Sequence, residues 1–192
     1  MRTLMLAAPL LVAGWSCAAE GLLVKQDPNE YAAAMKEAAK KFKGTPGVFL
    51  HIGDSITYAN QNTRWAKSGC TGGTAEEKAF AKWSHAGAGN DKDGWHQASV
   101  DSPAGGRSET ACSGIRADEY LKGGKSGMAS LADILKKYNP QLALYMLGTN
   151  DISASRPVDQ YIKDVEKAMD LLLENGTVPI LSTLPPYRGK TD

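Results

Sequence analysis

The chain has 192 residues, of which 42% are hydrophobic and 22% are charged. This composition is typical of one globular domain and excludes the intrinsically disordered and fibrous classes. The formal net charge is only +1. Because no strong charge of one sign would attract a phosphate backbone or an anionic lipid surface, neither nucleic acid nor membrane is expected as a partner.

Residues 1–19 have the pattern of a secretory signal peptide. Arg2 precedes an apolar run, and small residues then lead to Ala19, so cleavage is expected after Ala19. The run is shorter than the roughly 18 residues that cross a bilayer, which argues against a retained anchor. Lipidation of Cys17 is a less favoured alternative. We therefore expect a secreted or periplasmic protein with one domain over residues 20–192.

Two cysteines, Cys70 and Cys112, would remain after this cleavage. Because an exported protein meets an oxidising compartment, we expect them to form a disulfide, with two buried thiols as the alternative. Cleavage would also remove one of the 22 basic residues and no acidic one, which leaves the two signs balanced.

Three short apolar runs, each bounded by turn residues, predict β-strands. Each run is continuously apolar and does not alternate with polar residues, which is typical of parallel strands covered on both faces. The runs are Val48–Ile52, Leu142–Leu147 and Val178–Ser182.

Helical patterns lie before and between these runs, at Pro28–Lys43, Gly127–Tyr138 and Pro157–Glu174. Strands alternating with helices favour an α/β fold, so we predict a three-layer α/β/α sandwich with a doubly wound, flavodoxin-like parallel sheet. The stretch Tyr58–Ser113 is rich in glycine and polar residues and includes three tryptophans, and it predicts a long connection that forms a lid or substrate wall. A short strand near Ala98–Asp101 is the one element expected within it.

Chemically useful side chains follow two of the predicted strands. Gly53-Asp54-Ser55-Ile56-Thr57 follows the first, and Gly148-Thr149-Asn150-Asp151 follows the second. Ligands of open parallel sheets bind beyond the carboxyl ends of the strands, so Ser55 is placed to act as a nucleophile and the Asn150 amide to stabilise an oxyanion. The alternative is that Ser55 and Asp151 only cap helices and that Asn150 forms a turn.

These two segments resemble the first and third signature blocks of the SGNH hydrolase superfamily, the GDSL-like esterases and lipases. The resemblance covers roughly Val48–Pro186 and implies metal-independent ester hydrolysis, without a cofactor, through Ser55 and an oxyanion hole that includes Asn150. The second block supplies a glycine N–H to this hole, and Cys112-Ser113-Gly114-Ile115 is the best match. Gly114 is therefore expected to act here, with Gly105 and Gly106 as competitors.

The fourth block of the family, Asp-x-x-His, does not occur after Asp151. His51 lies within the first predicted strand and is expected to be structural, whereas His85 and His96 lie in the long connection. We therefore expect the catalytic Asp and His to lie outside these 192 residues, so that the chain alone would be inactive. A pseudoenzyme and a carbohydrate-binding module are the alternatives.

The expected substrate is a carbohydrate ester with an acetyl or other short acyl group. A signal sequence, a neutral charge and a tryptophan-containing connection favour this substrate over a lipid, since no apolar lid helix is evident in the sequence. Lysophospholipase or thioesterase activity on the same fold is the main alternative.

Overall fold

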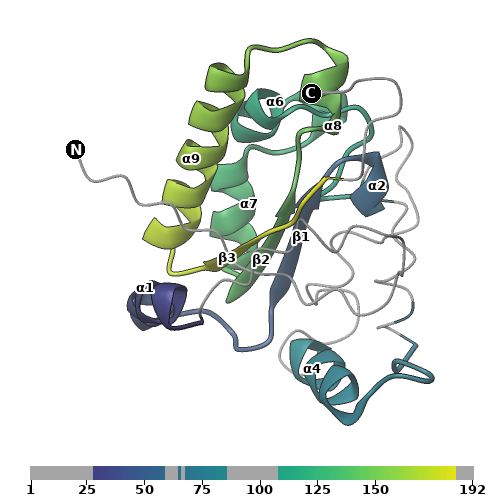
Figure 1. Cartoon of the computed structure of the whole chain (residues 1–192), viewed down its shortest axis with the longest axis vertical. Helices are drawn as coiled ribbons and strands as arrows, with labels where there is room; N and C mark the ends of the chain where they lie inside the picture. Colours follow the sequence, from purple (N-terminus) through teal and green to yellow (C-terminus); the bar gives the residue numbers. More distant parts are fainter. Residues whose placement is uncertain (1–27, 59–64, 66–67, 86–107, 185–192) are drawn as a thin grey trace.

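The structure is a computed structural model, and it describes residues 28–58, 65, 68–85 and 108–184 (Figure 1). Its centre is a parallel sheet of three strands in the order β1-β2-β3. The strands are β1 (Phe49–Gly53), β2 (Leu142–Met146) and β3 (Val178–Leu181). All three predicted strands are confirmed, with β1 beginning and ending one residue later and β2 and β3 ending one residue earlier than predicted.

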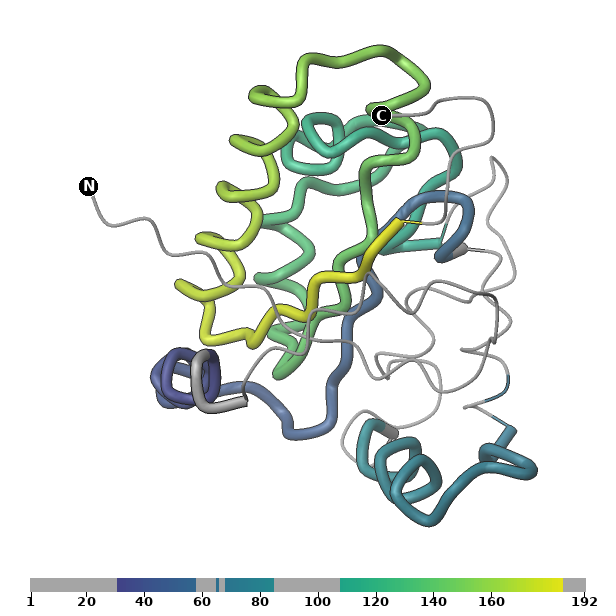
Figure 2. Tube along the Cα trace, viewed as in Figure 1, coloured from purple at the N-terminus to yellow at the C-terminus, as the bar shows by residue number. Residues whose placement is uncertain are grey.

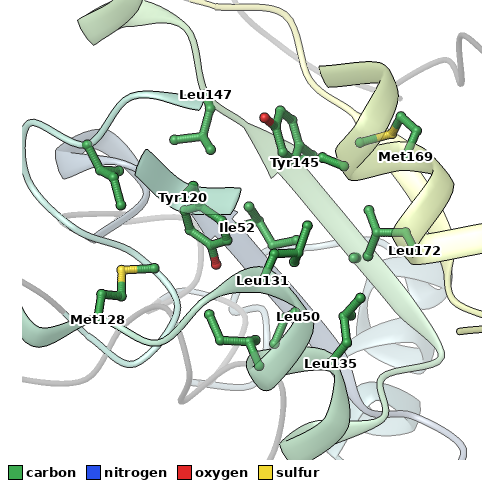
Figure 3. Close-up of a cluster of buried hydrophobic side chains, with 14 of the residues drawn as sticks. Leu50, Ile52, Tyr120, Met128, Leu131, Leu135, Tyr145, Leu147, Met169 and Leu172 are labelled. Atoms are coloured by element: carbon green, nitrogen blue, oxygen red, sulfur yellow. The ribbon is translucent and has the colours of Figure 1, made fainter. Parts of the chain in front are cut away.

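One face of the sheet is covered by α6 (Ala117–Lys122), α7 (Leu131–Tyr138) and α9 (Val158–Glu174). Alternate strand residues point into this layer and form the main hydrophobic core, which Figure 3 shows between strands and helices. Fully buried members of this core include Leu50, Ile52, Tyr120, Leu131 and Leu172. Burying such side chains contributes roughly 1.5–3 kcal/mol each.

The opposite face of the sheet contacts α4 (Ala75–His85). Phe49, the neighbour of Leu50 along β1, packs on this side, and its ring lies 5.7 Å from the ring of Phe80 in an edge-on contact. Helices therefore lie on both faces of a parallel sheet, which confirms the predicted α/β/α class.

The helix α4 corrects the prediction that residues 58–113 lack regular structure. Thr74 and Glu77 form a capping box at its start: the Glu77 N–H donates to Thr74 Oγ1 at 3.1 Å, and the Thr74 N–H donates to Glu77 Oε2 at 2.7 Å. A threonine followed three residues later by a glutamate is a helix-start signal that the sequence displays. The strand expected near Ala98–Asp101 lies outside the described residues.

Ala111 lies beside the end of β1, on the edge that β2 does not occupy. The Gly53 N–H donates to the Thr110 carbonyl at 3.4 Å, and the Cys112 N–H donates to the Gly53 carbonyl at 3.1 Å. The chain thus passes from β1 to one side of that strand and then to β2 on the other side. Such a reversal is the topological switch point at which doubly wound sheets bind ligands.

The predicted disulfide between Cys70 and Cys112 is wrong. Both residues are buried thiols. Cys112 belongs to the core under α6 and α7, whereas Cys70 packs with Phe49 on the opposite face, so the sheet lies between the two sulfur atoms. A disulfide requires Cα atoms within about 7 Å, which two faces of one sheet do not provide without rearrangement.

The first helix lies at the edge of this core. α1 (Pro28–Lys41) begins at the predicted proline and packs against α9 and β3. The helix predicted from Gly127 is instead a short 3₁₀ turn, Lys125–Gly127, followed by α7, which begins after the capping residue Ser130. Of the helices that the structure describes, none combines the length and apolar character required for a membrane span.

Candidate active site

Ser55 is the first residue of α2 (Ser55–Tyr58), a single helical turn at the carboxyl end of β1 (Figure 1). The chain reverses tightly here, since a Cβ on Gly53 would lie 1.9 Å from Thr57 Oγ1. Only glycine allows this close approach. As a result the Ser55 side chain is exposed, directly after a buried strand and a buried aspartate. The predicted nucleophile is therefore accessible at the switch point.

Asp54, immediately before Ser55, is only 1% exposed. Its carboxylate accepts two hydrogen bonds, one from the Ile56 N–H at 2.9 Å and one from the Asn150 amide at 3.1 Å. Burial raises the pKa of Asp54, which the backbone hydrogen bond from Ile56 partly offsets and the charge of Asp151 increases. Asp54 therefore links the first and third sequence blocks.

Gly114 occupies the turn from Cys112 to Ile115, which we call the Gly114 turn. The Ile115 N–H donates to the Cys112 carbonyl at 3.2 Å, and Gly114 has a φ of +74°, in the region that favours glycine. Lys125 Nζ donates to the Gly114 carbonyl at 2.7 Å. Gly114 is exposed, and its N–H has no hydrogen-bond partner among the described residues, so this N–H is available to a ligand. The competing glycines at 105 and 106 lie outside the described residues.

Asn150 lies in α8 (Thr149–Ser153), which follows β2. Its Nδ2 donates to Asp54 Oδ2 at 3.1 Å and to the Ile115 carbonyl at 3.0 Å. One amide group therefore joins the segment of Ser55, the Gly114 turn and its own helix. Both amide protons are engaged in this arrangement, so an oxyanion would have to share one of them or displace one of these acceptors.

Asp151 provides a second link between the same segments. Asp151 is 3% exposed, and its Oδ2 accepts the N–H of Ala117, the first residue of α6, at 3.1 Å. Its other oxygen accepts from Arg156. Asp151 therefore caps a neighbouring helix, whereas the sequence suggested only a cap of its own.

Arg156 is a site residue that the sequence did not indicate. Besides Asp151, its guanidinium binds Asp164 of α9 at 2.7 Å and lies 3.5 Å from Asp118 of α6. Hydrogen bonds to Asp164 and Asp151 raise the pKa of Arg156, so it is charged at all relevant pH values. No local motif signals this role, because Asp118 and Asp164 are brought to Arg156 only when α6 and α9 pack together.

A family model described as GDSL-like Lipase/Acylhydrolase matches residues 49–189. The match begins within β1 and includes Ser55, Gly114 and Asn150. The chain belongs to this family. Searches of curated proteins and of solved structures found no match.

Membership of the GDSL-like lipase/acylhydrolase family makes the protein a hydrolase of the SGNH type that acts on esters. It also agrees with the observed parallel sheet and flanking helices. The structure brings the segments of Ser55, Gly114 and Asn150 together through the Asn150 amide.

His51 is the one histidine whose side chain the described part of this acylhydrolase includes. It lies within β1, is 2% exposed, and its ring centroid is 4.7 Å from that of Phe49. Burial lowers the pKa of His51 to about 4. These features fit the structural role expected for His51. His85 is the last residue of α4, but the structure does not describe its side chain. His96 lies outside the described residues.

Proposed function

We propose that this GDSL-like acylhydrolase is exported and removes acetyl or other short acyl groups from carbohydrate. The signal-like residues 1–19 and the balanced charge support an extracytoplasmic, uncharged substrate. Trp65 offers an exposed aromatic surface on which a sugar ring could stack, 39% of its surface being accessible. The family relationship supports an ester bond as the target.

The mechanism would proceed through an acyl-enzyme at Ser55. The Ser55 hydroxyl attacks the acyl carbonyl, its proton passes to a base, and the sugar oxygen leaves with a proton, after which water releases the acid. The Ser55 N–H, the Gly114 N–H and the Asn150 amide would hold the oxyanion. The observation that supports this proposal is the pair of Asn150 hydrogen bonds to Asp54 and Ile115, the neighbours of Ser55 and Gly114 along the chain.

The base is the part of the machinery that the described residues do not supply. His51 is buried in the sheet and packed on Phe49, and no Asp-x-x-His sequence follows Asp151. We therefore propose that the 192-residue chain alone hydrolyses p-nitrophenyl acetate no faster than its Ser55→Ala variant. Turnover that depends on Ser55 and is lost in His85→Ala or His96→Ala would instead assign the role of base to that histidine.

The substrate class can be tested with the natural protein, meaning the protein as its source organism produces it, and with the Ser55→Ala variant of that protein. We expect Ser55-dependent release of acetate from acetylated oligosaccharides, with much slower hydrolysis of a lysophospholipid or an acyl thioester. Faster hydrolysis of either competing substrate would assign the protein to that class. Binding of acetylated oligosaccharide without hydrolysis of any ester would identify a pseudoenzyme and contradict the proposed activity.

A further inference from the structure

We propose that Asp151 is a positioning residue that holds the Gly114 turn against Asn150, and that Arg156 holds Asp151 in turn. This inference rests on the proposed function, in which Gly114 and Asn150 stabilise the oxyanion. Neither Asp151 nor Arg156 is proposed to touch the substrate. Their effect on the reaction would be exerted through the two donors.

Two hydrogen bonds join the segment after Gly114 to consecutive residues of α8. Asn150 Nδ2 donates to the Ile115 carbonyl at 3.0 Å, and the Ala117 N–H donates to Asp151 Oδ2 at 3.1 Å. The first bond alone would leave the turn able to pivot about Ile115. A second attachment two residues along fixes its orientation, and Gly114 is covalently next to Ile115.

The Ala117 N–H depends on Asp151 for a partner. As the first residue of α6, Ala117 has no partner for this N–H within its own helix. Ala117 is fully buried and Asp151 is 3% exposed, so water does not readily replace the carboxylate. An unsatisfied buried N–H is costly, so loss of the carboxylate should shift the start of α6 and the turn before it.

Arg156 holds the Asp151 carboxylate that accepts the Ala117 N–H. One guanidinium nitrogen binds Asp151, and another binds Asp164 of α9 at 2.7 Å. The backbone N–H of Arg156 also donates to the backbone carbonyl of Asp151 at 3.0 Å, so the backbone and side chain of Arg156 both hold Asp151. Asp164 of α9 is thus a second partner of the guanidinium and does not itself contact Asp151 or the Gly114 turn among the described contacts.

The chain offers a matched pair of variants. In Asp151→Asn the new side chain has one oxygen and one NH₂ group. The oxygen should stay on the charged guanidinium of Arg156, which can only donate, so the NH₂ group faces the Ala117 N–H and cannot accept from it. Asp164→Asn removes a carboxylate from the same guanidinium, yet the ion pair of Asp164 within the described residues is with Arg156 alone. Both variants remove a negative charge from beside Arg156, and only Asp151→Asn also breaks the hydrogen bond to the Ala117 N–H.

The test measures the rate at which a fluorophosphonate probe labels Ser55 in the natural protein, together with kcat and KM. A displacement of about 1 Å can cost 10²-fold, so Asp151→Asn should lower the labelling rate and kcat by about 10²-fold with KM unchanged. Asp164→Asn should change both by less than about threefold. Equal losses in the two variants, or parental rates in Asp151→Asn, would overturn the inference.

An amide NMR spectrum decides the same point without turnover. In the parent and in Asp164→Asn the Ala117 amide should be protected from hydrogen exchange, and in Asp151→Asn that protection should be lost and the Gly114 signal should shift. Unchanged Gly114 and Ala117 signals in Asp151→Asn would refute the positioning role. If these signals change while no Ser55 labelling occurs in the parent, the proposed function fails and the structural link remains.

Discussion

At the scale of single residues, the amide of Asn150 is the group on which the site depends. It contacts the carboxylate beside Ser55 and the carbonyl beside Gly114, so it holds these two segments together, and in the proposed mechanism it would also donate to the oxyanion. A group that acts on the transition state affects kcat, whereas a group that only binds substrate affects KM.

We therefore expect Asn150→Ala to lower kcat by on the order of 10²-fold with little change in KM, as measured by steady-state ester hydrolysis. Asn175 provides a control, because its amide nitrogen also joins two acceptors, Asn139 Oδ1 and Thr177 Oγ1, but at the far end of α9. Asn175→Ala should leave kcat unchanged. An increase in KM alone for Asn150→Ala would assign it to substrate binding.

His51 gives a prediction about stability and pH. Its pKa is about 4 in the folded protein and about 6.5 in an unfolded chain, so below pH 6.5 the unfolded state binds more protons and is favoured. The free energy of unfolding should fall by about 3 kcal/mol from this group as the pH drops from 7 to 4. Denaturant titrations of the parent and of His51→Gln measure this, and equal pH dependence in the two would exclude His51 as its source.

At the scale of elements, the sharp reversal between β1 and α2 determines where Ser55 lies. A methyl group on Gly53 would meet Thr57 Oγ1 at 1.9 Å and the Met146 carbonyl oxygen at 3.1 Å. The first contact can be relieved only if α2 moves away from β1. Such a movement would carry Ser55 with it.

Gly53→Ala should lower the free energy of unfolding by about 2–3 kcal/mol and abolish labelling of Ser55. Gly72→Ala is the control: Gly72 has a φ of +77° but open space around its Cβ position, so it tests backbone strain alone, at about 1 kcal/mol. Thermal unfolding and probe labelling give both quantities. A smaller loss of stability in Gly53→Ala than in Gly72→Ala would show that the reversal tolerates a side chain.

Elements differ in how well the sequence predicts them. The three strands were predicted because each is a continuous apolar run, which burial on both faces favours, and β1 is buried along its whole length. α4 was missed although Thr74 and Glu77 form its capping box, because the glycines around them suggested a loop. The disulfide was predicted wrongly because a count of cysteines does not show that Cys70 and Cys112 lie on opposite faces of the sheet.

At the scale of the whole molecule, the winding of the chain explains why the site lies where it does. From β1 the chain goes first to Ala111 on one side and later to β2 on the other. Figure 2 shows the traces of β1 (blue), β2 (green) and β3 (yellow) side by side. Ser55 follows β1, the Gly114 turn follows Ala111, and Asn150 follows β2. Sequence motifs indicated those three residues, whereas Arg156 could not be found in this way because its role depends on the packing of α9 against α6.

The central claim is that Ser55 is the residue that becomes acylated. The most direct measurement is to treat the natural protein with a fluorophosphonate probe and to map the adduct by peptide mass spectrometry. The account predicts one adduct, on Ser55, that is absent in Ser55→Ala together with all ester hydrolysis. An adduct on a different serine, with hydrolysis retained by Ser55→Ala, would contradict it.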